Sequence, residues 1–512
     1  MSSMLTRFYT QSARLNELLN KDPNEAVKQA RLIDCHTPER LNSLALRAAT
    51  LVDGGALTQQ LDAIEEGVTL FRELYGLAPR SDILYNLANG LVAASGTPPP
   101  DASWLDHQER TREHRAEARQ YFWQVAHDGD VDSSLRTQAW TNLANQFNNS
   151  FRLGEAHDGW LSALEIDPEN GVAASSASRN LLWLYRQGGC SDQTYIEAAM
   201  LAKIAHRHRD RVIEYAGTQA AEKIAAFAAE FDDLPSRSPH TDPFISWLER
   251  ERLTLAPAVE LIDPTLGKLD WLMLPPIRER ESEARAVPPP VFSMFNMLKS
   301  DFILARDLAW RASDDTGWPE TGRFGDTLDH ATYGPDTSAL VLAHRTALDL
   351  LDKIAVTANH YFELGESPNR VYFGKLWRQS SRKTARVRPL NKKVEKAIRE
   401  GASALYGLAE LADDYERDAG ILRPQKDLRN TATHRFVVLH EFGDPAHSRQ
   451  APEIEHHQRK QFSQEVLGAL RVARSAIQML ALSISQYERG LAQRAAGPTA
   501  SLIIPDHDRF TR

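Results

Sequence analysis

One stretch of the chain, residues 137–170, constrains the fold more than any other. It reads TQAWTNLANQFNNSFRLGEAHDGWLSALEIDPEN and predicts two helices joined by a short turn. Small residues recur where the two helices would meet: Ala144, Ala156 and Ala163. Large residues recur on the faces turned toward neighbouring helices: Trp140, Leu143, Phe147 and Trp160. Pro168 ends the second helix. Alanines let antiparallel helices approach closely, and the large side chains fill the groove toward a neighbouring pair. The chain should therefore contain stacked helical hairpins.

The eight positions fall at the spacing of a 34-residue tetratricopeptide repeat. A single repeat cannot bury its own apolar face, so neighbouring copies are required. Weaker copies of the pattern are expected at residues 61–77, 83–94, 116–126 and 173–186. We therefore expect a TPR-like helical solenoid over residues 1–231.

Turn-rich composition separates this region from the rest of the chain. The segments DDLPSRSPHTDP (232–243) and PPIRERESEARAVPPP (275–290) carry the proline and polar clusters of linkers. Beyond them, apolar residues recur at helical spacing in five long segments, at 292–312, 338–364, 392–415, 424–441 and 460–490. No strand-like alternation stands out. The expected fold is all-α: the solenoid, a linker and Pro-rich lead-in (232–290), a helical bundle (291–495) and a tail (496–512).

Composition excludes several classes of protein. The 512 residues carry a formal charge of −9, which argues against a protein that coats nucleic acid through bulk charge. Cys35 and Cys190 are the only cysteines and lack metal-type spacing, so a disulfide scaffold or a thiolate zinc site is not expected. The N-terminus lacks a secretory pattern, and the most apolar stretch (469–484) is interrupted by Arg471, Arg474 and Gln478. We expect a cytoplasmic protein without a membrane partner.

A polar group interrupts the apolar helix predicted at 424–441. Within LRNTATHRFVVL (428–439), Arg429 and Asn430 are followed by His434, in the pattern R-N-x-x-x-H. Asn430 and His434 are four residues apart and share one face of a helix. Arg429 lies about 140° around the helix from His434, so it reaches a common site only through its long side chain. A site completed by a second protomer would ease this geometry.

The three residue types suit attack on a phosphodiester. His434 can take or give a proton near neutral pH, and Arg429 can stabilise charge on phosphate oxygens. Asn430 can bind the same oxygens or orient the imidazole. In RNA the 2′-hydroxyl supplies an internal nucleophile, so neither a metal nor a cofactor is required. The alternative is a surface helix whose Arg429 and His434 simply pair with carboxylates.

A basic segment points to the same substrate. Residues 375–396 hold nine basic residues and a single acidic one, Glu395. We expect six of the basic residues to contact RNA phosphates: Arg382, Lys383, Arg386, Arg388, Lys392 and Lys393. The alternative is a solvated run of charge with no ligand.

Three other histidines were considered as metal ligands. His456 and His457 follow a Pro-containing loop with acidic neighbours, but a metal site there lacks partners that the sequence can identify. His440 is interpreted as a hydrogen-bonded histidine at a helix end. No metal site is therefore expected.

Several blocks in one order resemble the HEPN superfamily (higher eukaryotes and prokaryotes nucleotide-binding domains), in particular bacterial members fused to N-terminal tetratricopeptide repeats. The resemblance spans about 247–488 and rests on WLERERLTLAP, LDWLMLP, FSMFNMLKSDFILARDLAW, ALDLLDKIAVTANHYFELG, VYFGKLW and LRNTATHR. It implies a dimeric bundle whose two Arg-His motifs share one cleft. In active members this cleft is a metal-independent endoribonuclease that leaves a 2′,3′-cyclic phosphate. Arg429, Asn430 and His434 match the family's Arg, polar and His positions.

Two functions follow from this resemblance. The first is a toxin-like or antiviral-defence ribonuclease whose repeats bind an unidentified protein as a sensor or inhibitory arm. The second is a non-catalytic protein-interaction or nucleotide-binding module, because some family members are inactive.

Overall fold

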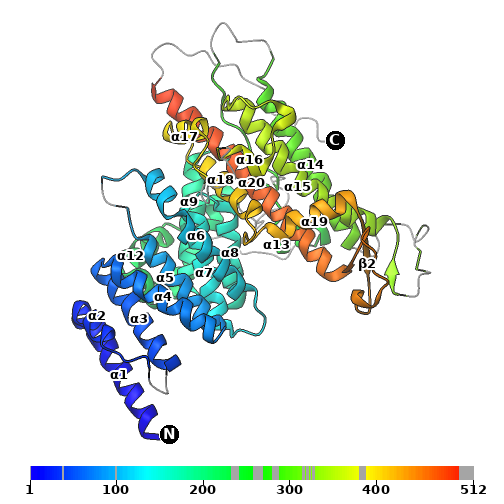
Figure 1. Cartoon of the computed structure of the whole chain (residues 1–512). Coiled ribbons are helices and arrows are strands. Elements are labelled where there is room, and N and C mark those ends of the chain that lie inside the picture. The colour runs from blue at the N-terminus through cyan, green and yellow to red at the C-terminus, as the bar shows by residue number, and fades with distance from the viewer. Residues whose placement is uncertain are drawn as a thin grey trace.

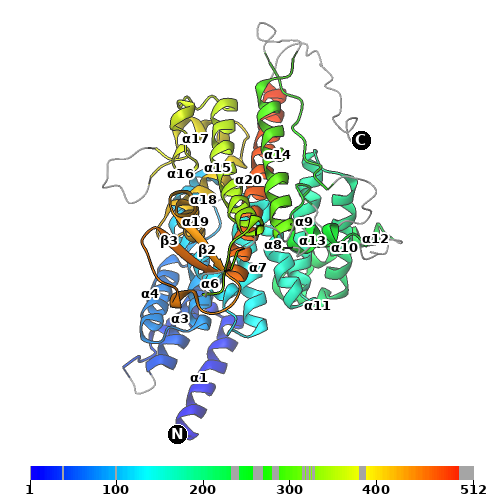
Figure 2. The same cartoon turned by 90° about the vertical axis from the view of Figure 1, so that its right-hand side faces the viewer.

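The computed structural model describes residues 2–36, 40–98, 101–231, 241–257, 269–279, 287–313, 318, 322, 324–325, 329–379 and 388–494. In these residues it contains twenty α-helices and one three-stranded sheet (Figures 1 and 2). The expected all-α class is confirmed, with the small sheet as an addition that the sequence did not indicate.

The N-terminal helices follow one another in antiparallel pairs. They are α1 (Ser2–Lys21), α2 (Pro23–Arg31), α3 (Arg40–Thr58), α4 (Leu61–Leu77), α5 (Ser81–Ser95), α6 (Trp104–His127), α7 (Ser133–Asn149), α8 (Leu153–Ile166), α9 (Gly171–Gln187), α10 (Asp192–Arg207), α11 (Arg209–Ala216) and α12 (Thr218–Ala229). Close contacts join α3 to α4, α5 to α6, α7 to α8 and α9 to α10. This arrangement agrees with the expected solenoid, while the assignment to the tetratricopeptide family stays a prediction.

The predicted hairpin is the pair α7 and α8. Ala144, Ala156 and Ala163 are fully buried between the helices. The approach is so close that a Cβ atom at Gly159 would lie 2.9 Å from the Cβ of Ala144. Trp160 is buried as well, and its indole donates to Asn145 over 3.2 Å. Small residues therefore set the helix separation here, as the pattern predicted.

The C-terminal half is a bundle around one long helix. Its elements are α13 (Pro243–Glu251), α14 (Pro290–Ser313), β1 (Ala331–Thr332), α15 (Pro335–Tyr361), α16 (Phe373–Leu376), α17 (Lys392–Arg399), α18 (Leu405–Glu416), α19 (Arg423–His434), β2 (Phe436–His440), β3 (Ile454–Gln458) and α20 (Arg459–Arg494), with short 3₁₀ turns at Pro368–Arg370 and Pro445–His447. Helix α20 contacts α14, α15 and α18, and also α8 and α9 of the N-terminal half (Figure 1).

Helix α20 is long and apolar enough to cross a membrane by length and composition. However, 83% of its most apolar window is buried inside the structure. The central helix of a bundle is also long and apolar, because other helices cover most of its surface.

Two predicted helices have different bounds. The segment 392–415 divides into α17 and α18 around Gly401, whose φ of +121° is a conformation that only glycine adopts readily. The helix expected to continue to residue 441 ends at His434, and the chain goes on as strand β2. The run Phe436–His440 is rich in β-branched and aromatic residues, which favour a strand.

The sheet has the order β1-β2-β3. Strand β1 pairs with β2 antiparallel, with Ala331 opposite His440. Strands β2 and β3 run parallel, with Val438 opposite His456 and His440 opposite Gln458. Side chains alternate between the two faces of a strand, so His440 and His456 share one face while His457 lies on the other.

Buried ion pairs join the two halves of the chain. Arg119 of α6 binds Glu410 and Asp414 of α18 over 2.8 and 3.1 Å, and Arg115 binds Glu410 over 2.5 Å. Arg152 also binds Asp414, and the Arg119 and Glu410 side chains are fully buried. Burial alone would raise the pKa of Glu410, but Arg115 and Arg119 outweigh it and hold that pKa below its ordinary value. The N-terminal helices are thus packed firmly on the bundle.

Candidate functional site on helix α19

Helix α19 is fixed to the bundle at its first turn. Gln425 accepts a hydrogen bond from Nε2 of His344 over 2.8 Å and donates to the carbonyl of Glu465 over 3.2 Å. Burial lowers the pKa of His344 to about 4, so this imidazole is neutral at physiological pH. A buried, neutral hydrogen-bonded pair therefore sets the start of the helix that carries the motif.

The other end of α19 is fixed to the sheet. Glu455 of β3 accepts from the Thr431 hydroxyl over 2.9 Å and pairs with Arg435 over 3.0 Å. The final turn of the helix is therefore held against β3, immediately beside His434.

Arg429 points into the bundle. Its Nε and Nη2 atoms donate to Oδ1 of Asp349 over 3.0 and 2.7 Å, and Nη2 also donates to Oδ2 of Asp352 over 2.8 Å. Both carboxylates come from α15. Burial by itself disfavours the charged guanidinium, but Tyr415, Asp349 and Asp352 outweigh that cost and raise the pKa of Arg429 above its ordinary value. The guanidinium is permanently charged and held in one orientation.

Asn430 and His434 face solvent on the same helix. Among the described residues, neither side chain has a hydrogen-bond partner within the protein. His434 is the last residue of α19, where the helix gives way to the exposed Arg435 and Phe436. Both polar side chains are accessible to a ligand or to a second protein chain.

The structure therefore brings the three predicted residues onto one helix but does not converge them within a single chain. Arg429 pairs with carboxylates, as the alternative interpretation expects, whereas His434 does not. Asp349 and Asp352 were missed from the sequence, because their partner lies 80 and 77 residues away. Their one visible signal is a pair of acids, three residues apart, in an otherwise apolar helix.

Asp352 connects the motif to the start of the basic segment. Its Oδ1 accepts from the backbone N–H of Phe373, at the first turn of α16, over 2.8 Å, while its Oδ2 holds Arg429. Beyond α16, Arg378 and Leu390 pair as an isolated antiparallel bridge. The described residues on the two sides of 380–387 are therefore paired with each other.

The basic residues have different surroundings. Arg388, Lys392 and Lys393 are exposed, with the ammonium of Lys393 donating to the Glu363 carbonyl over 2.8 Å. Arg382, Lys383 and Arg386 lie outside the described residues. Arg378, which belongs to the same run of charge, is buried and paired with Glu109 and Asp413 over 2.8 and 2.6 Å. Arg378 joins the two halves of the chain and is not free for a ligand.

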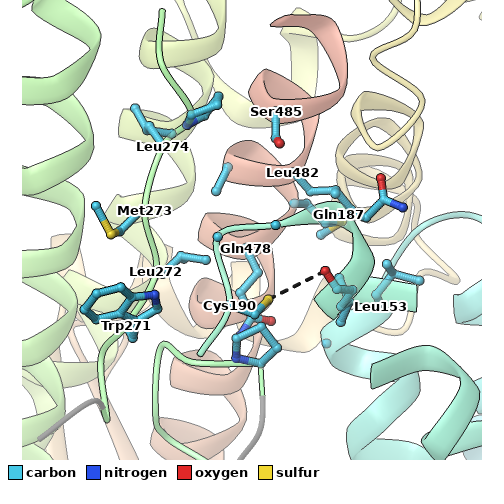
Figure 3. A pocket seen from close by; sticks show the side chains of 18 of the residues that line it. Leu153, Gln187, Cys190, Trp271, Leu272, Met273, Leu274, Gln478, Leu482 and Ser485 are labelled. Carbon is cyan, nitrogen blue, oxygen red and sulfur yellow. Dashed lines mark hydrogen bonds between the residues drawn. The ribbon is translucent and has the colours of Figure 1, made fainter. Parts of the chain in front are cut away.

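A cavity of about 500 Å³ lies elsewhere, among α8, α9, α20 and the segment 271–276 (Figure 3). Its lining is largely apolar and includes Leu272, Met273, Leu482 and Cys190. The Cys190 thiol donates to the Leu184 carbonyl over 3.7 Å, and burial raises its pKa to about 12. None of Arg429, Asn430 and His434 lines this cavity, so we do not treat it as part of the candidate site.

One family model matches the helical bundle that carries α19. The family model for LA2681-like HEPN matches residues 282–487, a range that covers α14 to α20 up to residue 487 and includes the motif on α19. No curated protein sequence matches the chain significantly. HEPN domains are commonly ribonucleases or serve nucleotide-related functions. The similarity to the HEPN family thus concerns residues 282–487 of the chain, which hold the motif on α19.

Proposed function

We propose that the protein is a metal-independent endoribonuclease of the HEPN type. One observation carries the proposal: α19 of the HEPN domain presents His434 and Asn430 to solvent, while two carboxylates of α15 orient the charged Arg429 of the same helix. A proton-transfer group, a polar group and a fixed cation are the parts that phosphodiester cleavage needs.

The reaction uses the substrate's own nucleophile. His434 takes the proton of the RNA 2′-hydroxyl, whose oxygen attacks the adjacent phosphorus. The bond from phosphorus to the 5′-oxygen breaks, and that oxygen receives a proton from an imidazolium. Arg429 stabilises the charge on the phosphate oxygens during the attack. The products are a 2′,3′-cyclic phosphate and a 5′-hydroxyl.

A homodimer is part of this proposal. Within one chain Arg429 points to α15 and His434 to solvent, so a second protomer would supply the missing partner residues. Phe436, two residues after His434, leaves 71% of its surface exposed, which is unusual for a phenylalanine and suits a contact between chains. A composite cleft would also place one histidine as base and the other as acid.

Sedimentation of Phe436→Ser tests the dimer. We expect the wild type to be dimeric at micromolar concentration and the variant to shift toward monomer, because the variant loses apolar area at the contact. Phe442→Ser is the matched control, since Phe442 is equally exposed (72%) but follows the other end of β2. A monomeric wild type under RNA-cleaving conditions would contradict the composite site.

Exposed basic residues would guide RNA to the cleft. Arg388, Lys392 and Lys393 face solvent, and Arg382, Lys383 and Arg386 belong to the same basic segment in the sequence. Such a patch binds phosphates without reading sequence.

The biological role we propose is that of a cytoplasmic toxin or antiviral-defence nuclease. The N-terminal solenoid would bind an unidentified protein and act as sensor or regulatory arm. The alternative is a non-catalytic interaction or nucleotide-binding module, which the ion pairs of Arg429 with Asp349 and Asp352 favour.

Expression in a bacterial host separates the two functions. We expect the wild type to arrest growth, and His434→Ala and Arg429→Ala to grow normally at equal protein levels. His360→Ala, a change at an exposed histidine on α15, is the control and should stay toxic. Host cells carrying phage or stress-induced RNA are included, so that an activating trigger is present. Equal growth of all four strains in every condition would favour the non-catalytic module.

A further inference from the structure

The sheet that follows α19 brings together three side chains that the sequence left apart. His440 of β2, His456 of β3 and Asp329, just before β1, place one possible ligand atom each within 4.8 Å of one another. His440 is 1% exposed. From this cluster we infer a binding site for a late first-row divalent metal ion, with zinc as its natural occupant.

The strand register creates the histidine pair. His440 and His456 lie on the same face of neighbouring parallel strands, and Nε2 of His440 is 2.9 Å from Nδ1 of His456. Two imidazole nitrogens so close share a single proton, and a metal ion replaces this proton when both lone pairs turn toward it. Ligand nitrogens at about 2.0–2.1 Å from tetrahedral zinc stand about 3.3 Å apart. The two nitrogens therefore need to separate by about 0.4 Å, and the rings need to rotate so that both lone pairs point at the ion.

Hydrogen bonds determine which nitrogen of His440 can bind the ion and how the Asp329 carboxylate is oriented. Nδ1 of His440 lies 2.9 Å from the carbonyl oxygen of Asp329. A carbonyl only accepts, so Nδ1 carries the hydrogen and Nε2 keeps its lone pair for the ion. Metal-binding histidines typically donate their other N–H in this way. The Asp329 carboxylate is oriented too, by the N–H of Ala331 over 3.2 Å and the Ser448 hydroxyl over 3.0 Å.

The donor set selects the metal. Two imidazoles and one carboxylate suit zinc, and they leave a fourth position for water. Magnesium and calcium prefer oxygen ligands alone. The ion would join the segment before β1 to β2 and β3, and through Glu455 of β3 it would brace the end of α19. The ion stands apart from the proposed cleavage chemistry, which uses no metal.

The strands also correct one interpretation made from the sequence. His440 was expected at a helix end, but it is the last residue of strand β2. The sequence could not identify partners for His456, because only the pairing of β2 with β3 and β1 brings His440, His456 and Asp329 together.

Metal content of the full chain tests the inference. The wild type is stripped of metal, incubated with Zn²⁺, desalted and analysed by mass spectrometry. We expect about one zinc ion per chain in the wild type and less than about a tenth of that in His456→Gln and Asp329→Asn. His457→Gln is the matched control, because it changes the next histidine on the same strand, whose side chain faces the opposite side.

Two further measurements distinguish the loss of a metal ligand from misfolding of the variants. Zn²⁺ should raise the melting temperature of the wild type and of His457→Gln, but not that of Asp329→Asn, whose amide keeps an acceptor for Ser448. Co²⁺ bound to the wild type should show the strong visible bands of a tetrahedral site. No zinc in the wild type, or equal zinc in wild type and Asp329→Asn, would overturn the inference and leave a hydrogen-bonded histidine pair.

Discussion

Arg429 is held by two acids, and this contact sets what the candidate site can do. Two carboxylates beside one guanidinium leave the local charge negative, which by itself would repel phosphate. The contact is therefore useful for cleavage only if it positions the guanidinium. In cleavage, Asp349 and Asp352 would act as positioning residues that orient the guanidinium of Arg429.

Asp349→Asn tests that role. We expect kcat for RNA cleavage to fall roughly 10–100-fold with little change in KM, since the cation loses its orientation but keeps its charge. Asp427→Asn, which changes a half-exposed partner of Arg423 on the same helix, should leave both constants unchanged.

The double variant Arg429→Ala/Asp349→Asn sharpens the test. If Asp349 acts through Arg429, the double variant is no slower than Arg429→Ala alone, because the second change has nothing left to position. Strictly additive losses would mean that Asp349 acts independently of Arg429. A lowered melting temperature with unchanged kinetics would mean that Asp349 contributes only to stability.

At the scale of elements, α6 and α18 are joined by a buried ionic network centred on Glu410. Glu410→Gln should lower the free energy of unfolding by about 3–5 kcal/mol, because Arg115 and Arg119 lose their buried partner. Glu113→Gln, at a half-exposed pair with Arg417, should cost no more than about 1 kcal/mol. Urea unfolding measures both, and equal effects would contradict the network.

The same network predicts how stability depends on pH. The pKa of Glu410 is lowered in the folded state, so its contribution is complete above the unfolded value of about 4.3 and is lost as pH falls below it. The wild type should therefore lose stability more steeply in acid than Glu410→Gln does.

Some helices could be predicted from the sequence, whereas one strand and several ion pairs could not. The α7–α8 hairpin followed from local spacing, and α14, α15 and α20 followed from apolar periodicity, because these patterns act within one helix. Strand β2 was missed, since a short apolar run fits a helix or a strand equally well. The partners of Arg378 and Arg429 were also missed, because ion pairs across 269 and 80 residues leave no local pattern.

For the whole molecule, the packing of solenoid on bundle gives a physical route for regulation. Arg115 and Arg119 of α6 pair with Glu410 of α18. Helix α18 in turn contacts α19, which carries the motif. Arg474 of α20 adds a second contact by pairing with Asp158 of α8 over 2.8 Å. A protein bound to the solenoid could therefore act on the site through α18 without touching it.

The chemistry of the RNA ends tests the central claim most directly. Total RNA is digested with purified wild type and with His434→Ala, without added divalent cation, and the termini are mapped. We predict internal cuts that carry 2′,3′-cyclic phosphate and 5′-hydroxyl ends in the wild-type digest, and a rate at least about 100-fold lower for the variant. Intact RNA in both digests, or ends with a 3′-hydroxyl and a 5′-phosphate, would contradict 2′-hydroxyl attack assisted by Arg429 and His434.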